Sequence, residues 1–234
     1  IMKAIVFDFD ETLGHFGELG EFVENLEHWF NAPIKREILY ALLDTFPFFF
    51  RPKLFNLLNL IKRLKQDRII GKVIIYTNNM APRSWVLGVK KYLELKINYP
   101  LFDRVISAWK VDGKIIERKR TGHGKTYEDL VRCANLSRNT KVLFFDDQEH
   151  PIMEHQNVLA VHVIPYTYIV NGEELINRFL HSKLKCLIKN PEKFKNFMSI
   201  HMARYWKRKT HRKHPISKGE YKAIVKKIKI LADS

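Results

Sequence analysis

The stretch Lys3-Ala-Ile-Val-Phe-Asp-Phe-Asp-Glu-Thr-Leu-Gly14 decides the fold. Residues 3–7 predict a short buried strand, which ends where carboxylates and a glycine follow. Asp8 and Asp10 are therefore expected at the C-terminal end of that strand. In open α/β sheets, this is the end at which ligands bind.

Two later segments repeat this pattern of a buried strand followed by polar side chains. The runs Val73–Tyr76 and Lys141–Phe145 predict strands, and helical spacing of apolar residues predicts helices between the strands. Such alternation is typical of an α/β fold, a parallel sheet flanked by helices. Because the carboxyl ends of parallel strands share one edge of the sheet, one pocket is expected to collect five polar side chains: Asp8, Asp10, Thr77, Asp146 and Asp147.

The same patterns divide the chain. Helical spacing in residues 18–45 predicts a small helical insertion at about 15–50, after the first strand. We expect a core over residues 1–180, which contains this insertion, and a basic helical extension over residues 181–234. Further expected elements are helices over about 53–65, 83–94 and 126–135, and strands over 102–107 and 158–164. A turn at Val111–Lys114 is expected to join the strand over 102–107 to residues 115–116 as a hairpin.

The positive charge is concentrated in the C-terminal part. The 234 residues carry a formal net charge of +16, but residues 1–180 hold 25 Lys or Arg against 22 Asp or Glu, whereas residues 181–234 hold 16 against 3. Clustered cations release counterions from phosphates, so residues 181–234 favour a polyanionic partner such as nucleic acid. A solvated pair of basic helices is the alternative.

Other features exclude several protein classes. No apolar run reaches the roughly 18 residues of a membrane-spanning helix, so no membrane association is expected. The N-terminal run lacks the order of a secretion signal. Cys133 and Cys186 are far apart and argue against a disulfide framework or a cysteine-based metal site. We expect an intracellular protein of the cytoplasm or nucleus.

The collected carboxylates point to phosphoryl transfer. Four carboxylates in one pocket repel each other unless a cation compensates, and their hard oxygen atoms favour Mg²⁺. An aspartate can attack a phosphoryl group and form an aspartyl-phosphate. A second carboxylate two positions further on could donate a proton to the leaving oxygen and later accept one from water.

The series Asp8-x-Asp10-x-Thr12, a strand followed by Thr77, a lysine, and a strand followed by Asp146-Asp147 resembles the haloacid dehalogenase superfamily of aspartate-nucleophile phosphatases. The resemblance covers about residues 3–165 and implies a Rossmannoid fold. It implies that Asp8 is the nucleophile and Thr77 a hydrogen-bond donor to phosphate. It implies that Asp10 is the general acid/base and binds the metal through its backbone carbonyl. It also implies that Asp146 and Asp147 hold Mg²⁺ together with Asp8.

Within the superfamily, Phe-Asp-Phe-Asp-Glu-Thr-Leu-Gly, Arg51-Pro52 and Tyr-Thr-Asn-Asn are most similar to NLI-interacting-factor-like phosphatases, the RNA polymerase II C-terminal-domain type. Versions of these proteins occur in large DNA viruses. The resemblance implies a phosphoprotein substrate carrying phosphoserine or phosphothreonine. Two alternatives stay open: a nucleic-acid-end phosphatase that uses the basic tail, and a non-catalytic binding module on the same fold.

The resemblance also implies a lysine that contacts the nucleophile and the phosphate. Lys125, at the start of the helix before the last acidic pair, is the best placed, and Lys119 on the same loop is the alternative. A cation there would lower the pKa of the nucleophilic carboxylate. We further assign Thr12 and Asn78 as candidate substrate-binding residues.

Overall fold

The computed structural model describes residues 1–208 and 219–234, with side chains described for residues 1–203 and 219–234. Contacts between residues divide the chain into two compact units. The sheet unit comprises residues 1–14, 51–166 and 214–234, and the helical unit comprises residues 15–50 and 167–213. Each unit is built from segments that are far apart in the sequence.

The sheet unit is built on five parallel strands: β1 (Lys3–Phe7), β2 (Lys72–Tyr76), β3 (Arg104–Ile106), β6 (Lys141–Asp146) and β7 (Val158–His162). Their order across the sheet is β3-β2-β1-β6-β7. The chain winds outward from β1 on one side and then resumes at β6 on the other, which is the doubly wound order. The predicted α/β fold with a parallel sheet is therefore confirmed.

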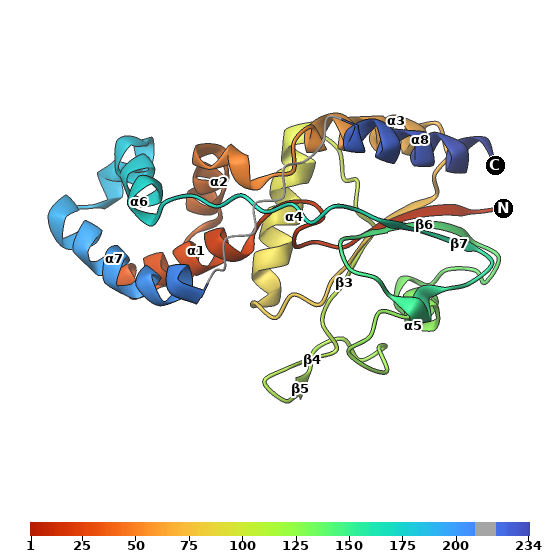
Figure 1. The fold of residues 1–234 in the computed structure, drawn as a ribbon, viewed down its shortest axis with the longest axis horizontal. Helices are drawn as coiled ribbons and strands as arrows, with labels where there is room; N and C mark the ends of the chain where they lie inside the picture. Colours follow the sequence, from red (N-terminus) through yellow and green to blue (C-terminus); the bar gives the residue numbers. More distant parts are fainter. Residues whose placement is uncertain (209–218) are drawn as a thin grey trace. The chain divides into compact units, whose positions relative to one another are not determined.

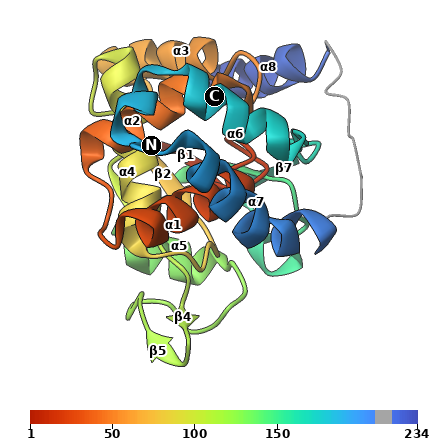
Figure 2. The ribbon, with the colours of Figure 1, turned by 90° about the vertical axis from the view of Figure 1, so that its left-hand side faces the viewer.

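In the described part of the sheet unit, the sheet is accompanied by a small hairpin, four α-helices and a short helical turn at Pro151–Met153. The hairpin consists of β4 (Lys110–Val111) and β5 (Lys114–Ile115), which pair antiparallel around the predicted turn. The prediction of residues 102–107 as its first strand is wrong, because β3 there pairs parallel with β2 instead. The helices are α3 (Leu54–Gln66), α4 (Arg83–Ile97), α5 (Tyr127–Ala134) and α8 (Glu220–Asp233). Figures 1 and 2 show α3 and α8 over one face of the sheet and α5 over the other. No helix in the described ranges is both long and apolar enough to cross a membrane.

Residue alternation along the strands explains why both faces are covered. Ala4 and Val6 of β1 belong to a core cluster with Tyr127 and Leu130 of α5. Successive side chains of a strand point to opposite faces, so the fully buried Ile5 faces the other helix layer. A strand buried on both faces reads as a continuous apolar run, which is what residues 4–7 show.

Helix α8 is anchored to the sheet at both its apolar face and its C-terminal end. Ile224, Ile228 and Leu231 are buried, and α8 contacts β6. Lys3 Nζ donates a hydrogen bond to the carbonyl oxygen of Ala232 at 2.8 Å. A cation at this end of a helix stabilises the unpaired carbonyls and the helix dipole.

The helical unit comprises α1 (Gly17–Phe30), α2 (Arg36–Thr45), α6 (Gly172–His181), α7 (Pro191–Arg208) and the short turns at Pro47–Phe49 and Lys183–Leu187. Phenylalanines form its core. The Phe22 ring lies 5.7 Å from those of both Phe46 and Phe179, and Phe179 lies 5.1 Å from Phe194. These contacts join the predicted insertion to the segment after residue 167.

The two units group the chain differently from the boundary that we predict at residue 180. Residues 167–180 belong with the insertion, and α8 belongs with the sheet. Grouping by contacts does not test which segments fold independently, so the domain boundaries stay a prediction. The basic run Lys207–Lys213, which favours a polyanionic partner, lies outside the described side chains.

Replacing Ile228 with Ala is expected to lower the free energy of unfolding by about 2–5 kcal/mol, because the fully buried side chain would leave a cavity beneath α8. Ile230 on the same helix is 47% exposed, and Ile230→Ala should change stability by less than about 0.5 kcal/mol. Urea unfolding followed by circular dichroism measures both values. Equally small effects of the two substitutions would contradict the docking of α8.

Candidate active site

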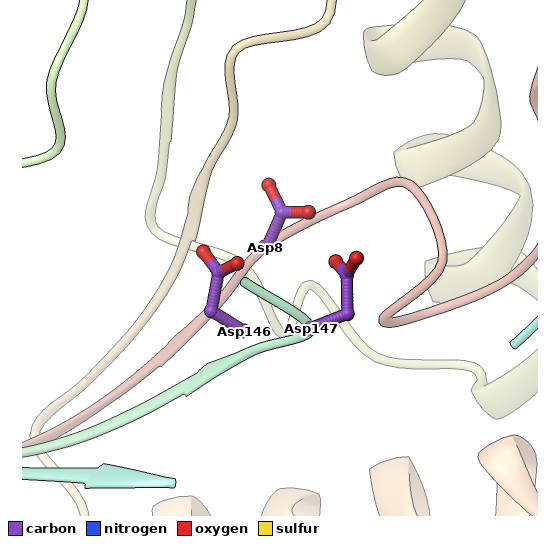
Figure 3. Close-up of side chains that lie close together, drawn as sticks. All are labelled: Asp8, Asp146 and Asp147. Atoms are coloured by element: carbon purple, nitrogen blue, oxygen red, sulfur yellow. The ribbon is translucent and has the colours of Figure 1, made fainter. Parts of the chain in front are cut away.

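Three aspartates meet at the centre of the sheet, where the strand order reverses. Asp8 directly follows β1, Asp146 ends β6, and Asp147 comes next. Figure 3 shows the three carboxylates pointing into the same space, and one oxygen of each lies within 4.8 Å of the others. Ligands of doubly wound folds bind at this switch point. Asp8 of the early acidic pair is therefore brought together with the late pair, while Asp10 is not one of the clustered carboxylates.

A buried lysine lies between two of these aspartates. Lys125 Nζ is 2.5 Å from Asp8 Oδ1 and 2.6 Å from Asp146 Oδ2, and the side chain is 3% exposed. Its ammonium lies about 6 Å from the ring centres of Tyr76 and Phe144, which border it with apolar surface. Lys119, the alternative, is exposed. Of the two predicted lysines, Lys125 is the one in contact with the candidate nucleophile.

The loop that carries Lys125 is fixed by a buried arginine. Arg120 donates hydrogen bonds to the carbonyl oxygens of Ser107 and His123 at 2.8 Å, and to those of Thr77 and Gly124 at 3.2 Å. These carbonyls belong to the segments after β2, after β3 and before Lys125. Sequence reasoning missed this role, because Arg118, Lys119 and Arg120 have similar chemistry and only the fold buries one of them.

The predicted Thr12 and Thr77 both take part in hydrogen bonds at the site. Thr12 contacts an aspartate directly, and Thr77 contacts Asn79, the residue that binds Asp10. Thr12 Oγ1 donates to Asp147 Oδ1 at 3.2 Å. Thr77 Oγ1 accepts a hydrogen bond from the backbone N–H of Asn79 at 2.9 Å. Because this bond uses only a lone pair, the hydroxyl hydrogen of Thr77 remains able to donate to a phosphate oxygen.

The predicted Asn78 is exposed, and its neighbour makes the contact instead. Asn79 Nδ2 donates to Asp10 Oδ2 at 2.7 Å. The tandem Asn78-Asn79 gives no sequence signal that distinguishes the two side chains. A substrate-binding role for Asn78 stays a prediction.

Burial shifts the pKa values of the N-terminal pair upward. Desolvation raises the pKa of Asp8 to about 6, although the Lys125 ammonium opposes the shift. Desolvation also raises the pKa of Asp10 to about 6, against the hydrogen bond from Asn79. A carboxyl group that titrates near neutral pH can both donate and accept a proton, as acid/base catalysis requires. Asp10 therefore has the proton affinity that its predicted role needs.

The pKa values of Asp146 and Asp147 shift in opposite directions. Burial raises the pKa of Asp146, but the nearby His150 ring and the Lys125 ammonium outweigh it and leave that pKa lowered. Burial and the charge of Asp146 raise the pKa of Asp147. His150 Nε2 lies 3.0 Å from Asp146 Oδ2, but the two groups do not have the geometry of a hydrogen bond. Their contact is that of an ion pair when the ring is protonated.

The donor set fits a hard divalent cation. Asp8, Asp146 and Asp147 form a buried cluster of carboxylates only, and Lys125 offsets one of their three charges when all are ionised. An uncompensated buried charge is costly, and carboxylate oxygens are ligands that Mg²⁺ prefers. These residues could therefore hold Mg²⁺.

A cavity of about 200 Å³ begins at Thr77 and Asn79. Its wall continues along the first turn of α4 and the base of the β4–β5 hairpin, and most of the side chains there are apolar. They include Met80, Pro82, Val86, Ala108, Val111 and Ile116. Since Asn79 also holds Asp10, the cavity adjoins the candidate acid/base.

Comparisons with known proteins add little to this geometry. The chain matches no protein-family model and no curated protein sequence. Among solved structures, one described as a "putative beta-phosphoglucomutase" from Thermotoga maritima aligns over 85% of this chain and 99% of that chain, with 14% sequence identity and a TM-score of 0.34. Similarity at this level supports no inference about activity.

Mg²⁺ is expected to raise the melting temperature, and the increase should shrink as the pH falls through about 6, because protons then compete for Asp8.

In the metal-free protein, the raised pKa values of Asp8 and Asp10 lie above the unfolded value of 3.8. The folded state therefore binds more protons, and the contribution of these groups to stability falls as the pH rises from about 4 to 6. Thermal unfolding with and without Mg²⁺ across this range measures both effects.

Asp147→Asn should reduce the Mg²⁺-dependent increase, since it removes one carboxylate from the cluster. The matched control is Asp67→Asn, which removes the same charge from an exposed position at the end of α3. An Mg²⁺ effect that is independent of pH and equal in both variants would argue against a cation at this site.

Proposed function

We propose that the protein is a Mg²⁺-dependent phosphomonoester hydrolase of the haloacid dehalogenase type, with Asp8 as nucleophile. The observation that supports this most strongly is the contact of Lys125 with both Asp8 and Asp146, beside Asp147, at the switch point of the sheet. This arrangement supports the proposal because it offers, in one place, a carboxylate that could attack, a cation that could hold a phosphate and carboxylates that could hold Mg²⁺.

In the first step, a carboxylate oxygen of Asp8 attacks phosphorus, and the bond from phosphorus to the ester oxygen breaks. Lys125 and the Thr77 hydroxyl hydrogen stabilise the negative charge on the phosphoryl oxygens. Mg²⁺, when bound, supplies further positive charge against the repulsion between the anionic nucleophile and the anionic ester. The Lys125 contact also fixes the orientation of the Asp8 carboxylate before attack.

Asp10 moves the protons in both steps. Protonated Asp10 donates its proton to the departing ester oxygen, which leaves as an alcohol. Ionised Asp10 then accepts a proton from water, which attacks phosphorus and breaks its bond to Asp8, releasing phosphate. A pKa of about 6 leaves both forms populated near neutral pH. The hydrogen bond from Asn79 Nδ2 fixes the direction of the Asp10 carboxyl group.

The substrate that we favour is a phosphoprotein carrying phosphoserine or phosphothreonine, as in the C-terminal-domain phosphatases. The apolar cavity beside Asn79 supports a leaving group with apolar parts next to the phosphate. A volume of about 200 Å³ is enough for one or two side chains. Residues flanking a phosphoserine in a peptide could occupy it.

A nucleic-acid-end phosphatase is the second candidate. Its support is a stripe of exposed cations on α8, where Lys222, Lys226 and Lys229 follow one another at helical spacing. Such a stripe could contact the phosphates of a strand. This activity would use the same aspartates and differ only in what is bound next to the phosphate.

The test is hydrolysis of three substrates by the full chain with Mg²⁺: para-nitrophenyl phosphate, a phosphoserine peptide, and an oligonucleotide with a 3′- or 5′-phosphate. We expect a higher kcat/KM for the peptide than for the oligonucleotide. A preference for the oligonucleotide that weakens with salt would establish the second candidate instead. No hydrolysis of any substrate would favour a binding module without catalysis.

Lys125→Met should reduce kcat/KM by about 100-fold or more, because it removes a cation that contacts the nucleophile and would bind the phosphate. Lys119→Met is the matched control, since Lys119 lies on the same loop but is exposed. Its kcat/KM should remain within about threefold of the unmodified protein, as is usual for exposed positions. Similar losses in the two variants would refute the assignment of Lys125.

A further inference from the structure

A buried arginine holds the loop that follows Asp8. Arg51 Nε donates to the carbonyl oxygen of Thr12 at 2.5 Å, and Nη2 donates to those of Glu11 at 2.6 Å and Ile164 at 2.7 Å. Arg51 is 6% exposed. One planar guanidinium therefore links the loop after β1 to the segment after β7.

The loop needs such support, because part of its backbone is in an unfavourable conformation. Glu11 has a φ of 56°, in the left-handed region that side chains other than glycine rarely adopt. Its carbonyl oxygen accepts hydrogen bonds from Arg51 Nη2 and from the backbone N–H of Tyr166, the latter at 2.8 Å. Asp10 precedes this residue and Thr12 follows it, so the conformation of Glu11 sets the direction of both.

The arginine is in turn held by the first residue of α8. Glu220 Oε2 accepts from Arg51 Nη1 at 3.0 Å, and Glu220 Oε1 accepts from the backbone N–H of Ile164 at 2.8 Å. Both charged side chains are at least nine-tenths buried. A glutamate in the first turn also has a favourable interaction with the helix dipole.

We propose that Glu220 and Arg51 are positioning residues, through which α8 holds Asp10 in place for proton transfer. The proposal rests on the proposed function, because it assigns these residues to the acid/base step of that reaction. Neither side chain touches the reacting atoms. They act through the carbonyl oxygens of Glu11 and Thr12, next to Asp10. The C-terminal helix is then part of the catalytic unit, although more than 200 residues separate it from Asp10 in the sequence.

The acid/base step can be isolated by the choice of leaving group. An acidic phenol leaves readily without a proton, whereas the alkoxide of serine needs one. Displacing Asp10 should therefore slow hydrolysis of a phosphoserine peptide more than hydrolysis of para-nitrophenyl phosphate. Comparing kcat/KM restricts the measurement to the steps up to the first phosphoryl transfer.

The experiment compares Glu220→Gln and Arg51→Lys with the unmodified full chain on both substrates in Mg²⁺. We expect kcat/KM to fall by about tenfold or more on the phosphoserine peptide and by less than about threefold on para-nitrophenyl phosphate. The ratio of the two values does not depend on the folded fraction, so partial unfolding cannot produce this result. Asp233→Asn, which removes an exposed charge near the other end of α8, should leave the ratio unchanged.

The outcomes separate the two proposals. If the unmodified protein hydrolyses both substrates and Asp8→Asn hydrolyses neither, the proposed function stands. In that case, equal losses of kcat/KM on the two substrates in Glu220→Gln and Arg51→Lys would overturn the positioning role. A ratio that changes as much in Asp233→Asn would also overturn it. If the unmodified protein hydrolyses neither substrate, the proposed function itself fails, and the role of Glu220 and Arg51 in that reaction fails with it.

Discussion

The site depends on one buried ammonium group between two carboxylates. Lys125 contacts Asp8 and Asp146, which end neighbouring strands of the sheet. Without this cation, two carboxylates would face each other in a buried space, and their repulsion would oppose the close pairing of β1 and β6. The same charge is what a phosphoryl group would meet on entering the site. The positive charge of Lys125 is therefore needed both for the packing of the two strands and for the proposed chemistry.

Two buried guanidinium groups extend this arrangement to the surrounding loops. Arg120 binds carbonyl oxygens of the segments after β2 and β3 and before Lys125, while Arg51 binds those of the loop after β1 and the segment after β7. Arginine suits this task because several donors in one plane can bind several acceptors at once. The two side chains satisfy carbonyl oxygens of loops that lie around the aspartate cluster.

Much of this could be predicted from residue patterns. The strand over residues 3–7 and the turn at Val111–Lys114 were predictable because alternation, apolar runs and turn residues are local signals. The meeting of Asp8 with Asp146 followed from the rule that parallel strands share a carboxyl edge. The contacts of Asn79 with Asp10 and of His150 with Asp146 could not be predicted in this way. Each depends on the direction of a side chain in a loop, which local patterns do not encode.

The sequence by itself determined the parallel α/β fold and the set of aspartates at its carboxyl edge, because the order of strands and helices and their terminal residues are written along the chain. The sequence also singled out Lys125, but only the tertiary structure decided which arginines support the loops around the site. Arg118, Lys119 and Arg120 are alike in sequence, yet burial separates them, and the charge of Arg51 gains its partner from a helix near the other end of the chain. Burial and long-range pairing are properties of the packed chain, so they become visible only when distant segments are in contact.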